Sequence, residues 1–198
     1  MKVQNIDEFI SKDHLDQLKK RFFIENNNSH EFRVLEYSLE IFDVLSTAYS
    51  MGGKRRSLLY YSALLHDIGY EISPQKHDQH TRSIISTDPF FDIVPHPERL
   101  MMALIAGGHR KKLARELNQL SIRNQQIVKQ LAAILRIADA IDYPRDSFLS
   151  IKRLLLKSDC LEISIESTAF SIVAIRVSQK SSLFEEVFGL PVKLIEIS

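Results

Sequence analysis

One stretch constrains this chain more than any other: an apolar run from Leu58 to Leu65 ends in His66 and Asp67, with Gly69 two residues later. The run predicts a buried helix, and Gly69 is typical of a helix C-terminus that needs a residue able to adopt positive φ. A histidine and an aspartate buried without partners would be costly, so we expect something to compensate both. A divalent metal binds neutral imidazole and carboxylate together. A structural salt bridge is the alternative.

A second costly carboxylate lies in the longest regular segment, residues 121–143, which predicts a nearly all-apolar helix. Asp139 interrupts this helix, and Asp142 lies on its next turn. A carboxylate embedded among isoleucines and alanines needs a partner. Arg136, three residues before Asp139, is the structural partner that the sequence offers for one of the two.

His30 begins a predicted helix directly after residues 26–29, which supply a cap. Because His30 stands four residues before Val34, it shares the inward-facing stripe of that helix. Two interpretations are open for such a histidine: a packed or capping side chain, or a metal ligand.

Two further histidines, His77 and His80, are three residues apart and share one side of a predicted helix turn. A helical pair with this spacing can bind metal. We expect His77 to be only a helix-start residue, which leaves His80 as the candidate for a functional role.

His109 directly follows two glycines and precedes Arg110, Lys111 and Lys112. Glycines at this point allow the backbone to approach a ligand closely. A histidine followed by cations can serve phosphate oxygens. The alternative is a solvated basic helix cap.

The composition of the 198 residues narrows the function further. A formal net charge of +1 provides no basic field that would attract nucleic acid or an anionic membrane. No apolar stretch approaches the roughly 20 residues of a membrane span. The first ten residues lack the pattern of a signal peptide, and the single cysteine, Cys160, fits a reducing compartment. We therefore expect a cytoplasmic protein without a nucleic-acid or membrane partner.

The last quarter of the chain has a different hydrophobic period. Residues 160–166 and 170–177 alternate and are rich in β-branched side chains, which predicts two strands of a hairpin. Residues 181–188 predict a short helix, and residues 192–197 predict a third strand.

Two domains follow from this change of period. We expect a mainly α protein, with a helical domain at residues 1–150 and a small α+β tail at residues 151–198. The sequence indicates no group of catalytic residues in the tail.

The ordered set His30, His66, Asp67 and Asp139 resembles the HD superfamily of metal-dependent phosphohydrolases. The resemblance implies a helical bundle in which these four residues bind a divalent metal. Mixed nitrogen and oxygen ligands suit manganese, iron, nickel, zinc or magnesium.

Several motifs are similar to the C-terminal half of exopolyphosphatase/guanosine pentaphosphate phosphatase (Ppx/GppA) enzymes, from about His30 to the end of the chain. The matching stretches are Leu65–Gly69, His80–Ser83, His109–Lys111, Leu135–Asp142 and the terminal-helix sequence Leu183–Gly189. The actin-like domains that hold this family's usual catalytic site have no counterpart in the sequence, so we do not expect its standard mechanism. Some family members lose the histidine-aspartate pair here, whereas this chain keeps the full ligand set.

The related HD-GYP proteins bind a second metal with additional histidines, roughly where His80 and His109 fall in this chain. One ion or two is therefore an open alternative.

The function that this resemblance implies is hydrolysis of a phosphoester or phosphoanhydride in a nucleotide, an alarmone or polyphosphate. The catalytic residues would be Asp67, His80 and His109, with His80 or His109 as the general acid. Arg110 and Lys111 would bind the substrate and, with His109, stabilise the charge on the transferred group.

The alternative is a non-catalytic module that binds polyphosphate or a nucleotide and regulates a partner. Such a module would not need a stoichiometric divalent ion, so metal content distinguishes the two functions. The sequence leaves the oligomeric state open, and a homo-oligomer is one option.

Overall fold

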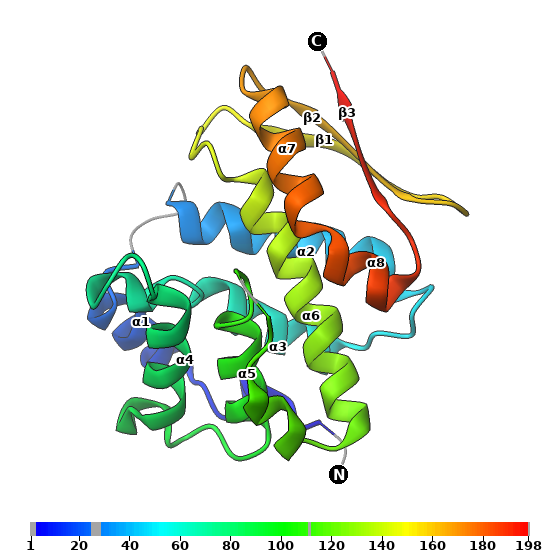
Figure 1. Ribbon diagram of the computed structural model, residues 1–198. Helices are drawn as coiled ribbons and strands as arrows, with labels where there is room; N and C mark the ends of the chain where they lie inside the picture. The colour runs from blue at the N-terminus through cyan, green and yellow to red at the C-terminus, as the bar shows by residue number, and fades with distance from the viewer. Residues whose placement is uncertain (1–2, 25–28, 111, 198) are drawn as a thin grey trace.

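A computed structural model describes residues 3–24, 29–110 and 112–197 (Figure 1). The mainly α fold with a small appendage that we expected from the sequence is confirmed. The α-helices before the tail are α1 (Lys12–Arg21), α2 (His30–Ser46), α3 (Gly53–Leu64), α4 (His77–Thr87), α5 (Glu98–Ala106) and α6 (Ile122–Ile141). Short 3₁₀ turns lie at Ile6–Glu8, Ile68–Glu71, Pro89–Phe91 and Arg115–Gln119.

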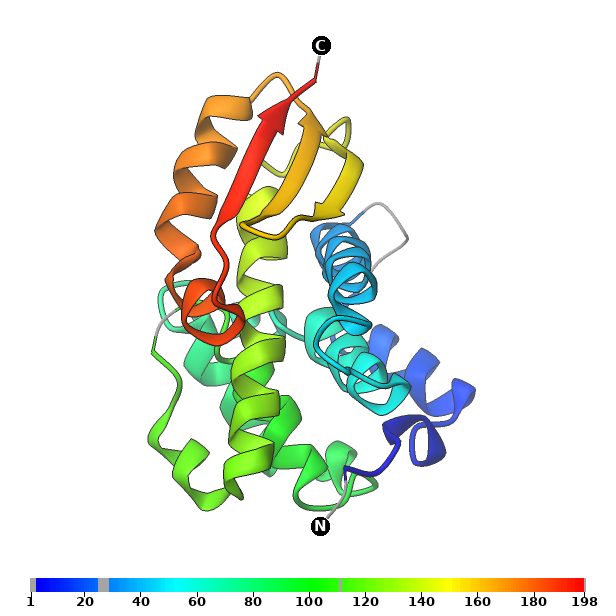
Figure 2. The ribbon, with the colours of Figure 1, turned by 90° about the vertical axis from the view of Figure 1, so that its right-hand side faces the viewer.

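Helix α6 is the centre of the molecule, and Figure 2 shows it running between the two helices of the tail on one side and the N-terminal helices α1, α2 and α3 on the other. It contacts α2, α3 and α5 on the side of the bundle and the two tail helices on the other. A helix that is apolar around most of its circumference must be covered on all sides, and α6 is buried at Leu131, Leu135 and Ile137. Asp139 is therefore held in the part of the fold where other elements converge.

The tail consists of β1 (Ser150–Leu156), β2 (Leu161–Glu166), α7 (Phe170–Lys180), α8 (Ser182–Phe188) and β3 (Val192–Glu196). Strand β2 is the middle strand; β1 pairs with it in antiparallel and β3 in parallel orientation. Its alternating residues Leu161, Ile163 and Ile165 are fully buried. Strand β1 contacts α2, and α7 contacts both α6 and β3.

The predicted strand at residues 170–177 is wrong, because this segment is α7. Val173 and Val177, four residues apart, are buried, whereas Ile172 and Ile175 are exposed. Parallel strands such as β2 and β3 need a crossover connection, and α7 and α8 provide it. The hairpin partner of β2 is instead β1, a strand that the sequence did not reveal.

The other tail elements agree with the sequence. Helix α8 ends at Gly189, which has a left-handed φ of 71°, and β3 follows it. The division into a domain at residues 1–150 and a tail at 151–198 stays a prediction. In the described part of the chain, no helix is long and apolar enough to cross a membrane.

Candidate metal centre

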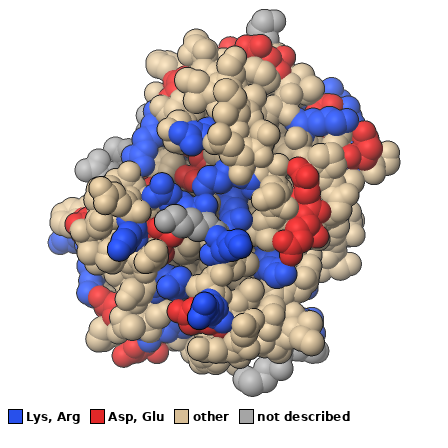
Figure 3. All heavy atoms as spheres, viewed as in Figure 1, with Lys and Arg blue, Asp and Glu red and all other residues tan. Residues whose placement is uncertain are grey.

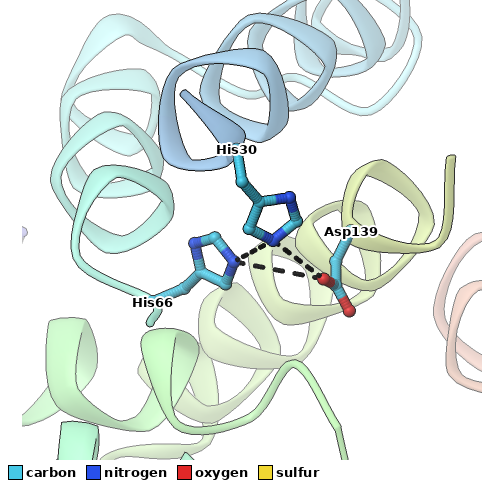
Figure 4. A group of neighbouring side chains, drawn as sticks. All are labelled: His30, His66 and Asp139. Carbon is cyan, nitrogen blue, oxygen red and sulfur yellow. Dashed lines mark hydrogen bonds and ion pairs between the residues drawn. The ribbon is translucent and has the colours of Figure 1, made fainter. Parts of the chain in front are cut away.

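Three segments bring His30, His66 and Asp139 together in the interior (Figure 4). His30 is the first residue of α2, His66 lies in the turn after α3, and Asp139 lies near the end of α6. The Nε2 atom of His30 lies 3.3 Å from Nε2 of His66 and 3.6 Å from Oδ1 of Asp139. Nε2 of His66 lies 4.0 Å from the same oxygen. This spacing suits three ligands of one ion.

Asp67, His77 and His109 form a second group beside the first. Oδ1 of Asp67 lies 3.2 Å from Nε2 of His77 and 3.6 Å from Nε2 of His109. Its other oxygen, Oδ2, lies 3.6 Å from Nε2 of His30. Asp67 therefore stands between the two groups.

His77 occupies the position beside His109 in which we expected His80. His77 begins α4, and its Nδ1 atom lies 2.9 Å from the carbonyl oxygen of Pro74, which holds the ring toward Asp67. His80 is half-buried one turn further along, where it packs near Gly69. Among the described residues, His80 belongs to neither group.

The second nitrogen of each of the four histidine rings has a hydrogen-bond partner that fixes its tautomer. Nδ1 lies 2.7 Å from the Ala63 carbonyl oxygen in His66 and 2.6 Å from the Ala106 carbonyl oxygen in His109. A carbonyl only accepts, so Nδ1 carries the proton and the Nε2 lone pair faces the group. Facing lone pairs repel unless a cation, either a proton or a metal ion, lies between them.

Asp142 supports the first group from behind and is completely buried. Its Oδ2 atom accepts a hydrogen bond from Nδ1 of His30 at 2.6 Å, and Arg33 donates to both of its oxygens at 2.7 and 3.0 Å. A carboxylate behind a ligating histidine orients the ring and raises its basicity. Arg136, which we considered as a partner for a carboxylate, donates to the Gly108 carbonyl oxygen at 2.7 Å.

The protonation states differ between the two groups. Burial opposes protonation of His30, but Asp139, Asp142 and Asp67 outweigh it and raise the pKa of His30 to about 9. Burial lowers the pKa of His109 to about 4, so this imidazole is neutral at neutral pH.

Both carboxylates in the two groups are ionised. Burial opposes ionisation of Asp67 and Asp139, but the surrounding histidines hold the pKa of each below its usual range. Lys180 contributes to the same effect at Asp139. Ionised carboxylates are suitable ligands for a divalent ion, and binding of such an ion would release the proton of His30.

Gly69 differs from our expectation of a left-handed helix cap. Helix α3 ends at Leu64, and the absence of a side chain at Gly69 lets α4 approach, because a Cβ atom there would lie 2.3 Å from the His77 carbonyl oxygen. Thr81 of α4 accepts a hydrogen bond from the Gly69 N–H and donates to the His66 carbonyl oxygen, both at 2.9 Å. These contacts lock the turn that carries His66 and Asp67 against α4.

A pocket of about 240 Å³ lies over both groups. Figure 3 shows Lys and Arg side chains gathered over the centre of this face. The basic residues that line the pocket are Arg110, Arg145, Arg176 and Lys180, and Tyr70 and Tyr143 are among its other walls. A pocket with carboxylates and imidazoles at its base and cations around them suits a metal ion and an anion together.

The sequence profile described as Ppx/GppA phosphatase, domain III, matches residues 10–172. The chain belongs to the Ppx/GppA phosphatase family. It is similar to a guanosine-5'-triphosphate,3'-diphosphate pyrophosphatase of Aeromonas hydrophila, at 28% identity over 91% of this chain and 37% of that protein. It is also similar to the protein of the same name from Aeromonas salmonicida, at 32% identity over 57% of this chain and 23% of that protein. The chain thus spans less than two fifths of the length of these curated relatives. The resemblance to the Ppx/GppA family that the sequence indicated is confirmed by the profile match.

In this Ppx/GppA phosphatase domain, Arg110 reaches over the second group, with Nη1 3.4 Å from Nδ1 of His77. Lys111, which we expected to bind the substrate, lies outside the described residues. His109 is 1% exposed and belongs to the second group instead of forming a solvated cap.

Four residues that line the pocket were not expected from the sequence to have a functional role: His77, Arg145, Arg176 and Lys180. Arg176 and Lys180 lie in α7, which the alternating pattern had misassigned as a strand for most of its length. Their spacing of four residues is the signal that could have found them, had the segment been recognised as a helix.

Proposed function

We propose that this chain is a metal-dependent phosphohydrolase with an HD-type centre that acts on a phosphoester or phosphoanhydride. The observation that carries the proposal is the convergence of four imidazole Nε2 atoms on Asp67 and Asp139, at the base of a pocket lined with cations. The substrate class is a nucleotide, an alarmone or polyphosphate, in keeping with the names of the Aeromonas relatives.

The residues present fit a divalent ion. His30, His66, Asp67 and Asp139 would hold the first ion, and His77 and His109 would join Asp67 around a second. Imidazole nitrogens and ionised carboxylates suit manganese, iron, nickel, zinc or magnesium. The short separations between facing nitrogens, 3.3 Å between His30 and His66 and 3.0 Å between His77 and His109, suit a shared cation in each group, either a proton or a metal ion.

A bound ion of this kind supplies polarisation of the phosphorus centre and a water of lowered pKa. The chain's own residues bind and orient the substrate. Arg110 and Arg145 line the pocket mouth and bind phosphate oxygens, which their guanidinium groups fit in shape and charge. His109 serves as a ligand in this scheme, because its neutral ring has its proton on Nδ1, committed to the Ala106 carbonyl oxygen. It therefore has no proton to donate from Nε2.

Elemental analysis of the purified protein, coupled to a phosphatase screen with and without added divalent ions, tests the proposal. We expect a stoichiometric metal and an activity that a chelator abolishes and the ion restores. A crystal structure grown with divalent ions that shows Asp67 paired with Arg145 and no metal would overturn it, since these two residues already lie 3.6 Å apart.

The cations around the pocket also favour a second candidate, a non-catalytic module that binds polyphosphate or a nucleotide and regulates a partner. The partner would be another protein or a further copy of this chain. Such a module holds phosphate through Arg110 and Arg145 without needing the two histidine groups. Phosphate-ligand binding that is unaffected by metal removal, with no turnover of any phosphate substrate, would select this candidate.

A further inference from the structure

Helix α7 carries two cations into the pocket that lies over the histidine groups. Arg176 and Lys180 are four residues apart and therefore project from the same side of the helix. The other two lysine or arginine side chains that line the pocket come from other parts of the chain, Arg110 after α5 and Arg145 after α6. The tail thus supplies half of the basic residues around this pocket.

Lys180 is held next to both metal-ligand groups. Its Nζ atom donates to the His109 carbonyl oxygen at 3.0 Å and lies 3.8 Å from Oδ2 of Asp139, and its side chain is 21% exposed. An ammonium group has three donors. The carbonyl takes one of them, and Asp139 is beyond hydrogen-bond distance, so donors remain for an anion in the pocket.

Arg176 is fixed at the rim of the same pocket. Its guanidinium lies over the ring of Tyr143, 3.7 Å from the centroid, and Nη2 donates to the Tyr143 hydroxyl oxygen. A guanidinium anchored by an aromatic ring loses little further freedom when it binds an oxyanion. Of the described side chains, no carboxylate lies within 4 Å of its nitrogens.

The charge of the pocket also favours an anion. Asp142 is paired with Arg33, which leaves Asp67 and Asp139 to face the cations. Those cations are Arg110, Arg145, Arg176 and Lys180, and any bound divalent ion adds to the excess of positive charge.

We infer that α7 is the phosphate-binding wall of the site, with Lys180 contacting the phosphoryl group beside Asp139 and Arg176 contacting an anionic group of the substrate at the rim. The inference rests on the proposed function for the identity of the reacting group. It makes the tail a part of the active site, although deletion of the tail would leave all the proposed metal ligands in the chain.

The test measures binding of inorganic phosphate to the full chain by isothermal titration calorimetry, before and after loading with Mn²⁺. Lys180→Met keeps the aliphatic stem and removes the charge, and Arg176→Gln does the same at the rim. Lys129→Met is the matched control, because it removes a cation that pairs with Glu186 on the surface. We expect Lys180→Met to weaken phosphate binding about 10- to 100-fold and the control to leave it unchanged. Arg176→Gln should raise KM for a larger phosphate substrate.

The metal content of each variant, from elemental analysis, should equal that of the wild type. Wild-type phosphate affinity in Lys180→Met, with hydrolysis intact, would overturn the inference and leave the proposed function standing. Lys180-dependent phosphate binding in a chain that hydrolyses no phosphate substrate would uphold the inference and remove the proposed function. If Lys180→Met does not fold, Lys180→Arg and Lys180→Gln replace it. Phosphate affinity that is retained in Lys180→Arg but lost in Lys180→Gln would show that the positive charge at this position binds phosphate.

Discussion

The Nε2 atoms of His77 and His109 face each other at 3.0 Å, with their rings inclined by only 15°. Both rings have Nδ1 next to a backbone carbonyl oxygen, so each ring turns its other nitrogen, Nε2, toward the gap. Oδ1 of Asp67 lies 3.2 Å from the nearer of the two. A cation between these three residues would relieve the repulsion, and this is the geometric basis for a second ion.

Asp67 is the proposed ligand that would be shared by both ions, so its loss should affect both. We expect Asp67→Ala to abolish metal retention while circular dichroism shows the helical signal mostly intact, because the residue lies in a turn between α3 and α4. Asp159→Ala, which removes an exposed carboxylate paired with Lys193, is the control. Full metal occupancy in Asp67→Ala, measured by elemental analysis, would contradict the assignment.

His77 and His80 provide a matched pair for the second ion. His77→Ala should lower the metal-to-protein ratio from two to one, whereas His80→Ala should leave the ratio unchanged, because only His77 lies in the second group. The ratio is measured after equilibration with excess Mn²⁺ and desalting. The reverse result would show that the helix start is not a ligand and would restore the role that the sequence suggested for His80.

Asp142 should strengthen metal binding through His30, without contacting the ion itself. Asp142→Asn weakens the hydrogen bond that orients His30, and changes at such supporting carboxylates typically cost about 10- to 100-fold in metal affinity. Competition with a chromogenic chelator measures the loss. Asp43→Asn, on α2 in an exposed pair with Arg56 of α3, should have no effect on affinity. Equal affinities for the two variants would refute the supporting role.

The stability of the metal-free protein should peak near pH 6.5. The pKa of His30 rises from 6.5 to about 9 on folding, so its contribution is complete below about pH 6.5 and is lost as the pH rises through 9. The pKa of His109 falls from 6.5 to about 4, so its contribution is complete above about pH 6.5 and is lost as the pH falls toward 4.

Urea unfolding of chelator-treated protein at a series of pH values measures this profile. His30→Asn should flatten the alkaline side, and His109→Asn should flatten the acidic side. A wild-type free energy of unfolding that does not change between pH 6.5 and 9 would count against the raised pKa of His30.

Arg110 distinguishes a substrate contact from a solvated cap. Arg110→Ala should weaken binding of an anionic substrate about 10- to 100-fold without displacing the metal, because a charge-assisted phosphate contact is worth about 1.5–3 kcal/mol. If Arg110 is only a cap, the same change should shift stability by less than about 0.5 kcal/mol and leave the kinetics unchanged. Lys111→Ala carries the same prediction from the sequence alone. Steady-state kinetics and metal analysis of both variants separate the outcomes.

The sequence by itself determined the features that depend on local pattern. Helical periodicity placed α2, α3 and α6, and the cost of burying a charge singled out His66, Asp67 and Asp139, because both signals are complete within one or two turns of chain. The order of these residues and the flanking motifs also indicated the family. His30 was predicted to be a ligand only through that order, since one histidine on an inward stripe has several ordinary explanations.

Only the tertiary structure decided the features that depend on contacts between distant segments. Arg33 pairs with Asp142 across 109 positions, and Lys180 reaches His109 across 71. Residues 170–177 fit two periods, and the choice of helix was made by the parallel pairing of β3 with β2, which requires a crossover. The preference for His77 over His80 arose in the same way. A three-residue spacing leaves both on one side of a helix, and the approach of α4 to Gly69 determines which one faces Asp67.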